Sequence, residues 1–158
     1  MNSDLDLVLR RVIRAPRATV WEAWTDPASL EEWWLPAPMQ CRVERFEPRP
    51  GGAFVTSMSE DGQTFVPHFD GCVLVVDEPE RLVFTNGLDS QWRPATPQPV
   101  AMTAVITLLD HPDGTDYGAV VRHGDPAARE LHEQLGFLDG WGAVTEQLAA
   151  IAERRAGQ

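Results

Sequence analysis

The sequence predicts an α+β fold in which a curved antiparallel sheet surrounds one long C-terminal helix. Three observations predict it: a first strand is followed directly by two short tryptophan-rich helical segments, six further strand-like segments come in succession, and the chain ends in an amphipathic segment over residues 126–155. An antiparallel sheet needs its apolar face covered, and only this last segment is long enough to cover it. We therefore expect the sheet to curl around the terminal helix, with the short helices closing the space between them.

The first strand is predicted over residues 5–14, where apolar residues alternate with polar ones. Four of the six tryptophans then fall within positions 21–34. Pro16 suits the first turn of a helix, and the residues after it place an apolar side at helical spacing. Thr25-Asp26-Pro27 ends this helix, and Asp26 is expected to cap a second short helix. Two short helices that carry large rings are typical of the lid of an apolar cavity.

Six further strands are predicted from apolar alternation and from the turn residues between them. Gly71 lies within the longest of these strands, where we expect a bulge or a bend. Residues 87–99 contain three prolines and are predicted to form a loop that carries Trp92. The six strands are expected at residues 41–47, 53–58, 64–76, 81–85, 100–109 and 115–123.

The terminal helix is predicted to begin at Pro126, after a cap at Asp125, and to continue to about Arg155. Its apolar residues recur at spacings of three and four, as one buried stripe requires. They are Leu131, Leu135, Leu138, Trp141, Thr145, Leu148 and Ala152. This order of elements is an α+β helix-grip arrangement, and a chain of this length forms a single domain over residues 1–158.

Composition excludes several classes of function. The net charge is −11 and all 13 cations are arginine, which argues against nucleic-acid or anionic-lipid surfaces. No apolar run approaches the ~18 residues of a membrane span. Cys41 and Cys72 show no metal or redox spacing, and no signal peptide precedes Leu5, so we expect a cytoplasmic protein with two reduced, buried thiols. The four histidines lack metal-binding spacing, and we expect neither a metal nor a cofactor.

Several short motifs occur along the chain in a fixed order. They are Ala15-Pro16, Val20-Trp21, Thr25-Asp26-Pro27, Leu30, Trp33-Trp34, Arg49-Pro50-Gly51-Gly52, Asp61-Gly62, Pro79-Glu80-Arg81-Leu82-Val83, Asp113-Gly114-Thr115 and Gly140-Trp141. In this order and spacing they resemble the START-like superfamily, also called the SRPBCC or Bet v 1-like superfamily, over roughly residues 5–155. Within it, the chain is similar to the group homologous to the C-terminal domain of the heat-shock protein 90 ATPase activator.

The resemblance implies a helix-grip fold with a deep apolar cavity. Members of the superfamily bind lipids, sterols, polyketides or plant hormones, and some are aromatase/cyclases. No single catalytic set defines the small bacterial members of the group. Many relatives carry a histidine where this chain has Leu138, and that departure favours binding over catalysis.

Eleven residues are candidates for contact with an apolar ligand, because apolar walls with few polar groups typify small-molecule sites. Any one of them is alternatively a plain core residue. Trp92 is expected to fold over the cavity mouth. Gly140 and Gly142 flank Trp141, and they either leave room for a ligand or lid helix or allow close packing. The candidates are Trp24, Trp33, Phe54, Met58, Phe69, Phe84, Trp92, Met102, His123, Leu138 and Trp141.

Three hypotheses about function follow. The first is a carrier or sensor of an apolar small molecule such as a lipid, a polyketide or an aromatic compound. The second is a cyclase or hydrolase acting on a hydrophobic substrate, with His123 and either Asp70 or Glu22 as the acid/base pair to test and the catalytic residues otherwise unknown. Serine-nucleophile, P-loop and Rossmann motifs are all absent from the sequence.

The third hypothesis is a chaperone-associated interaction module, which predicts a large exposed patch and no accessible cavity. The sequence shows no additional N-terminal domain of the activator, so we expect the chaperone connection to extend to the fold alone. The sequence is also compatible with a homodimer.

Overall fold

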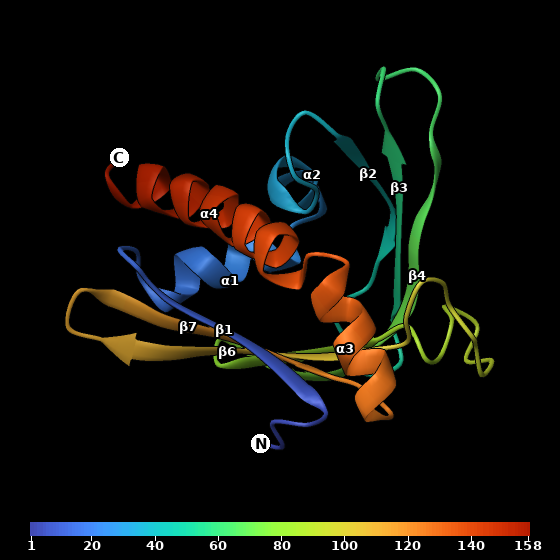
Figure 1. Ribbon diagram of the computed structural model, residues 1–158. Coiled ribbons are helices and arrows are strands. Elements are labelled where there is room, and N and C mark those ends of the chain that lie inside the picture. The colour runs from blue at the N-terminus through green and yellow to red at the C-terminus, as the bar shows by residue number, and fades with distance from the viewer.

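A seven-stranded antiparallel sheet in the order β1-β7-β6-β5-β4-β3-β2 supports the whole molecule. The computed structural model describes residues 1–158. The sheet bends strongly, so that β2, β3 and β4 stand at a steep angle to β1, β6 and β7, and the helices lie on its concave side (Figure 1). The strands are β1 (Asp6–Ile13), β2 (Gln40–Phe46), β3 (Ala53–Ser59), β4 (Val66–Asp77), β5 (Arg81–Thr85), β6 (Thr103–His111) and β7 (Gly114–Arg122).

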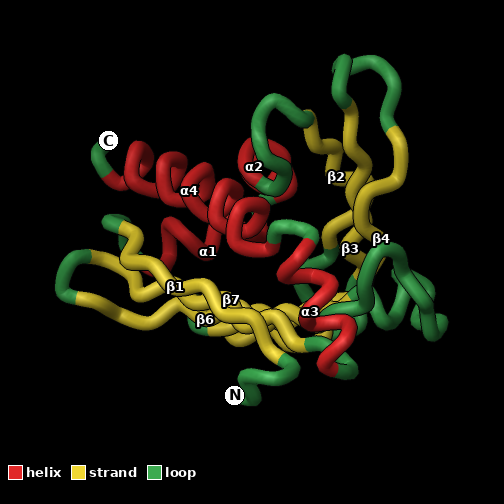
Figure 2. Tube along the Cα trace, viewed as in Figure 1, coloured by secondary structure: helices red, strands yellow, loops and turns green.

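Four helices cover this sheet (Figure 2). They are α1 (Arg17–Thr25), α2 (Pro27–Trp33), α3 (Pro126–Gln134) and α4 (Phe137–Ala156). Helix α4 packs against α1, α2 and β1, while α3 packs against α4 and β1. The predicted α+β helix-grip fold, with two short helices after the first strand, is confirmed.

The prediction of one continuous terminal helix is wrong, because the chain turns between α3 and α4. Gly136 has a φ of 96°, in the left-handed region that glycine adopts at little cost. Asp125 caps α3 as predicted, since its carboxylate accepts a hydrogen bond from the Ala128 N–H at 2.8 Å. The break divides the predicted stripe: Leu131, Leu135 and Leu138 are exposed, whereas Thr145, Leu148 and Ala152 are buried.

The bulges in β4 fall on either side of Gly71 rather than at it. Thr56 pairs with Phe69 and Ser57 with Pro67, so His68 is an extra residue in β4, and a second shift occurs between Val73 and Val75. Gly71 itself is closely packed, because a Cβ there would collide with the Phe69 ring and the Thr85 carbonyl. The bulged residue, His68, is one of the residues of the candidate site described below.

Two smaller predictions also need correction. Asp26 precedes α2 without capping it through its side chain, and its carboxylate instead accepts a hydrogen bond from the Ser29 hydroxyl at 2.8 Å. Cys72 is buried, but Cys41 is only partly buried. No helix is long and apolar enough to cross a membrane.

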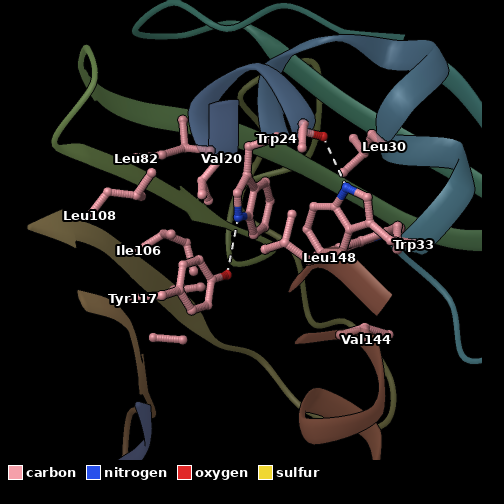
Figure 3. Packing of buried hydrophobic residues seen from close by; sticks show 14 of the residues in the cluster. Val20, Trp24, Leu30, Trp33, Leu82, Ile106, Leu108, Tyr117, Val144 and Leu148 are labelled. Carbon is pink, nitrogen blue, oxygen red and sulfur yellow. Dashed lines mark hydrogen bonds between the residues drawn. The ribbon is translucent and has the colours of Figure 1, made fainter. Parts of the chain in front are cut away.

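The core is built around indole rings from the tryptophan-rich segment (Figure 3). The Trp24 indole N–H donates to the Tyr117 hydroxyl at 3.0 Å, and the Trp33 indole N–H donates to the Ala23 carbonyl at 2.9 Å. The Trp24 and Trp33 rings meet edge to face with centroids 4.6 Å apart. Because both buried donors have partners, these two rings are held in fixed positions in the core.

Candidate functional site

A cavity of about 340 Å³ lies between the N-terminal half of α4 and the bent part of the sheet. Helix α4 contributes Trp141 and Val144, and β4 contributes Phe69. The remaining walls come from the α3–α4 turn, the segment after α2 and the loop before β6. The full lining is Trp34, Leu35, Pro36, His68, Phe69, Asn86, Gln98, Pro99, Val100, Met102, His132, Leu135, Gly136, Phe137, Gly140, Trp141 and Val144.

Trp34 is the ring that joins the cavity wall to the core. Its centroid lies 5.2 Å from that of Phe54, 5.9 Å from Phe84 and 6.3 Å from Trp141. The side chain is buried, yet its indole N–H has no hydrogen-bond partner in the protein. A buried unpaired donor costs roughly 1–3 kcal/mol, which makes Trp34 an exception among the core tryptophans.

The two glycines of α4 leave open space rather than allowing close packing. A Cβ at either Gly140 or Gly142 would meet no atom within 4 Å. Close packing against Trp24 or Trp33 is therefore excluded as the reason for these glycines. Gly140 lines the cavity and Gly142 does not, so only Gly140 leaves volume free at the cavity wall.

A polar space of about 270 Å³ adjoins the cavity and shares part of its lining. His68 and Gln98 line both spaces, and Asp70 and Asp89 line only the polar one. His68 Nδ1 lies 3.0 Å from the Thr56 hydroxyl, which holds the ring at the boundary. The apolar cavity therefore borders a polar space whose lining includes two acidic side chains.

A pair of histidines lies at another wall, where His132 lines the cavity and His123 lies behind it. His123 follows β7, and its Nδ1 lies 2.8 Å from the Leu5 carbonyl oxygen, while its Nε2 lies 2.8 Å from Nδ1 of His132 on α3. Burial and the neighbouring His123 lower the pKa of His132 to about 4, so this ring is neutral at pH 7. Both ring nitrogens of His123 are thus engaged, and the acid/base pair to test for an enzyme, His123 with Asp70 or Glu22, is not formed. The Asp70 carboxylate instead accepts from the Ser90 N–H at 2.7 Å.

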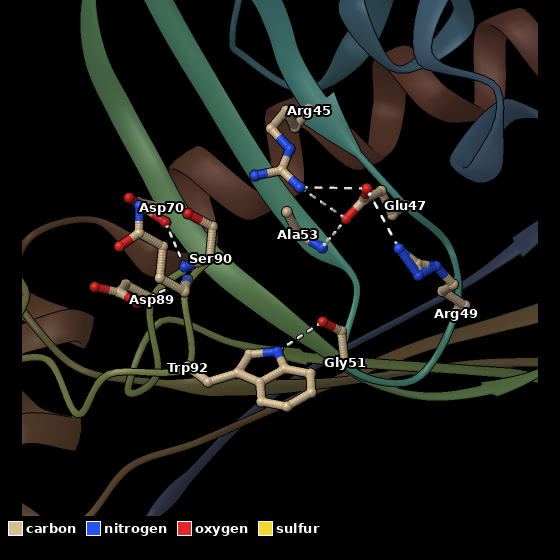
Figure 4. A network of polar contacts seen from close by, with 10 residues as sticks. Arg45, Glu47, Arg49, Gly51, Ala53, Asp70, Asp89, Ser90 and Trp92 are labelled. Carbon is tan, nitrogen blue, oxygen red and sulfur yellow. Dashed lines mark hydrogen bonds and ion pairs between the residues drawn. The ribbon is translucent and has the colours of Figure 1, made fainter.

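Trp92 does not cover the cavity mouth. Its indole lies over the turn between β2 and β3, donates to the Gly51 carbonyl at 2.7 Å and remains 65% exposed (Figure 4). A Cβ at Gly51 would lie 2.8 Å from the indole, and φ there is 82°, so both contact and conformation require glycine. The prediction failed because Trp92 packs against the outer side of this turn.

The turn under Trp92 is itself held by an ionic network (Figure 4). The Glu47 carboxylate accepts a hydrogen bond from the Ala53 N–H at 2.9 Å and pairs with Arg45 and Arg49. The Ala53 hydrogen bond, followed by that of Arg45, lowers the pKa of Glu47 below its usual value. No group of three or more histidine, cysteine or acidic side chains is arranged to hold a metal ion.

Comparison with known proteins gives this architecture a family. The sequence pattern of the family described as "Activator of Hsp90 ATPase homolog 1-like protein" matches residues 14–153. The chain belongs to this family. It thus falls within the SRPBCC, or START-like, superfamily, as its motifs predicted. None of the curated proteins matches the sequence.

Solved structures agree with this assignment. A protein from Nitrosomonas europaea is 37% identical, with full coverage of both chains and a TM-score of 0.87. A protein from Mycobacterium smegmatis is 26% identical, with 94% of this chain and 90% of that one covered and a TM-score of 0.76. The AHSA1-like protein from Aeromonas hydrophila is 19% identical, covers 98% and 96% of the two chains and has a TM-score of 0.71, which shows the shared fold.

Within this member of the activator-homologue family, three of the eleven candidate residues line the cavity: Phe69, Met102 and Trp141. Four lie in the core behind them and contact the Trp34 ring. They are Trp24, Trp33, Phe54 and Phe84. Contact of the three lining residues with a ligand stays a prediction.

The other four candidates lie outside the lining. Met58 is partly buried on β3, and Trp92 lies on the outer turn. His123 is buried one residue behind the wall, in contact with His132. Leu138 is 60% exposed, because the break at Gly136 rotates the first turn of α4 away from the stripe predicted for one helix.

Sequence reasoning missed Trp34, His132 and Phe137 as wall residues. Trp34 follows the last residue of α2, where helical spacing no longer predicts direction. The signal for the other two was Gly136, which ends a run of helix-favouring residues as a C-terminal glycine does. A break placed there would have brought His132 and Phe137 together at the turn.

Proposed function

We propose that this protein binds a small, largely apolar molecule in the cavity between α4 and β4. The observation that carries the proposal is a cavity of about 340 Å³ walled by aromatic and aliphatic side chains. Small-molecule sites typically measure roughly 300–1,000 Å³ and are lined by apolar groups with a few polar ones. The cavity lies at the lower end of that range, which favours a compact ligand of one or two rings.

The local geometry of α4 supports this proposal. Glycine inside a helix costs about 1 kcal/mol relative to alanine. Gly140 lies next to Trp141 in the cavity wall, and a Cβ at this position would meet no protein atom, so packing within the protein does not explain the glycine. Open space at this helix face is therefore better explained by a bound ligand than by packing within the protein.

The accessible cavity also favours binding over the interaction-module hypothesis, which required its absence. The family name refers to Hsp90 ATPase activation, and for this chain we carry over the fold from that name. An enzymatic role in the same cavity would need a polar group at the wall, and the lining offers His68, Asn86, Gln98 and His132.

The proposal is tested by co-purification of a ligand. Protein purified from its own host is measured by native mass spectrometry and then extracted under denaturing conditions. We expect one apolar compound per chain on the wild type, and none on a Gly140→Leu variant, whose side chain would fill the cavity.

Gly142→Leu is the matched control, because it changes the same residue type in the same helix without lining the cavity. Both variants gain helix propensity, so folding alone does not distinguish them. Retention of the compound by Gly140→Leu, or an empty wild-type protein that gains no thermal stability from apolar compounds, would contradict the proposal.

A further inference from the structure

We infer that His132 is a hydrogen-bond acceptor in the cavity wall, and that the ligand carries a hydroxyl or N–H donor beside a planar apolar body. The inference rests on the proposed binding function, which it makes more specific. It follows from the chain of hydrogen bonds between Leu5, His123 and His132.

The proton positions along these hydrogen bonds follow from the first acceptor, the backbone carbonyl of Leu5. A backbone carbonyl oxygen only accepts hydrogen bonds, so Nδ1 of His123, 2.8 Å from the Leu5 oxygen, must carry a proton. In the neutral ring, Nε2 of His123 is then an acceptor. Nδ1 of His132 lies 2.8 Å away and must therefore donate to it.

This order leaves Nε2 of His132 with an unshared electron pair. The protein offers this nitrogen no hydrogen-bond partner, since Nδ1 makes the only hydrogen bond of the ring. His132 also lines the cavity, where most of the surrounding surface is aromatic or aliphatic. His132 thus adds a neutral imidazole with a free acceptor nitrogen to a wall whose other polar side chains are His68, Asn86 and Gln98.

The surrounding rings define the shape of the ligand that can reach this nitrogen. The His132 ring stands edge to face against Phe137, with centroids 5.2 Å apart, and Phe137 stacks on Trp141 at 5.6 Å and 29°. Trp141 in turn meets Trp34 at 6.3 Å. Flat faces beside one acceptor favour a planar apolar body with a donor at its edge.

The α3–α4 turn is what brings the acceptor to the cavity. Gly136 lies between α3 and α4 in the left-handed conformation, and the rings of His132 and Phe137 lie 5.2 Å apart across the bend at this turn. Helix α3 has no buried residue of its own, and the hydrogen bond between His132 and His123 links it to the residue that follows β7. Ligand recognition and α3 placement therefore depend on the same ring.

Two probes with the same planar ring system test the inference: 1-naphthol, which has a hydroxyl donor, and 1-methoxynaphthalene, in which a methyl group replaces the donor hydrogen. Binding to the full chain is measured by titration calorimetry at pH 7.5. One net hydrogen bond corresponds to a roughly tenfold difference in affinity. We expect 1-naphthol to bind about tenfold more tightly, and His132→Asn to remove that preference.

Asparagine keeps a donor near the position of Nδ1 while removing Nε2, and His132→Phe serves as a second variant that keeps a ring in the wall. His111→Asn is the matched control, because His111 ends β6 and does not line the cavity, and it should keep the full preference. A tautomer measurement is independent of ligand: ¹⁵N NMR of the free protein should show His132 protonated at Nδ1 and unprotonated at Nε2.

The outcomes separate the two proposals. Equal binding of both probes, a preference that survives His132→Asn, or a proton on Nε2 in the free protein would overturn the assignment of His132 and leave the binding function intact. Failure of both probes to bind the wild type would overturn the binding of planar apolar molecules, and the assignment of His132 with it.

Discussion

The Trp24 indole N–H on α1 donates to the Tyr117 hydroxyl on β7 at 3.0 Å, with both side chains fully buried. This hydrogen bond ties the first helix to the strand beside β1, across the centre of the core (Figure 3). The contact joins residues separated by 93 positions in the sequence.

Replacing Tyr117 with phenylalanine should destabilise the protein by about 1–3 kcal/mol, because it leaves the Trp24 N–H buried without a partner. Urea unfolding of the single variants Tyr117→Phe and Trp24→Phe and of the double variant measures the coupling. We expect the double variant to lose less than the sum of the single losses. Strict additivity would show that the bond contributes nothing to stability.

Trp33 and Trp34 offer a matched comparison of neighbouring rings. Trp33→Phe removes a hydrogen bond to the Ala23 carbonyl, whereas Trp34→Phe removes a donor that has no partner. Both variants lose similar ring volume, so we expect Trp33→Phe to be more destabilising by about 1–2 kcal/mol. Denaturant unfolding measures the difference, and a larger loss for Trp34→Phe would show that its N–H is satisfied in solution.

The same substitution should have opposite effects at two glycines of the C-terminal region. Gly136→Ala forces a side chain into the left-handed conformation and should destabilise by about 1 kcal/mol. Gly140→Ala should stabilise by about 1 kcal/mol, since it improves helix propensity and its Cβ meets no atom. Thermal unfolding of the two variants checks the signs; stabilisation by Gly136→Ala would show that α3 and α4 can join.

Stability should fall as pH is lowered from about 6.5 to about 4. The folded-state pKa of His132 is lowered to about 4 from 6.5, so in this range the unfolded chain binds a proton that the folded protein does not. The unfolding midpoint in urea, measured across pH 4–7.5, should therefore decrease toward acid. Between pH 5 and 6.5 the slope belongs mainly to histidines, because ordinary carboxylates titrate lower.

His132→Asn should flatten this slope relative to the wild type. It should not abolish it, because desolvation also lowers the pKa of His68. An unchanged slope in His132→Asn would mean that His132 titrates equally in the folded and unfolded states.

Most of the fold could be predicted because its signals are local. Apolar alternation located all seven strands to within a few residues, and Pro16, Pro27 and Asp125 marked the starts of helices. The break at Gly136 was missed because the leucines around it also fit one continuous helical stripe. The pattern fits either one continuous helix or two separate helices, and only the packing of α4 against α1, α2 and β1 selects the second.

The site was less predictable because its members are brought together by the path of the chain. Aromatic residues in strands and helices indicated an apolar interior, but spacing did not separate the lining residue Trp34 from the core residue Trp33. The pairing of His123 with His132 joins the end of a strand to a helix that lies across β1. No local sequence pattern encodes that contact.

The exposed contact between the Trp92 indole and Gly51, here called the clasp, fastens a cavity-lining loop from outside the core. The loop it fastens supplies Gln98, Pro99 and Val100 to the cavity wall, yet the clasp itself lies outside the core and consists of one hydrogen bond and one ring face. Undoing it exposes no buried indole and breaks no strand pairing. Replacing Trp92 should therefore loosen a loop that forms part of the cavity wall while the buried tryptophans and the strand pairing stay in place.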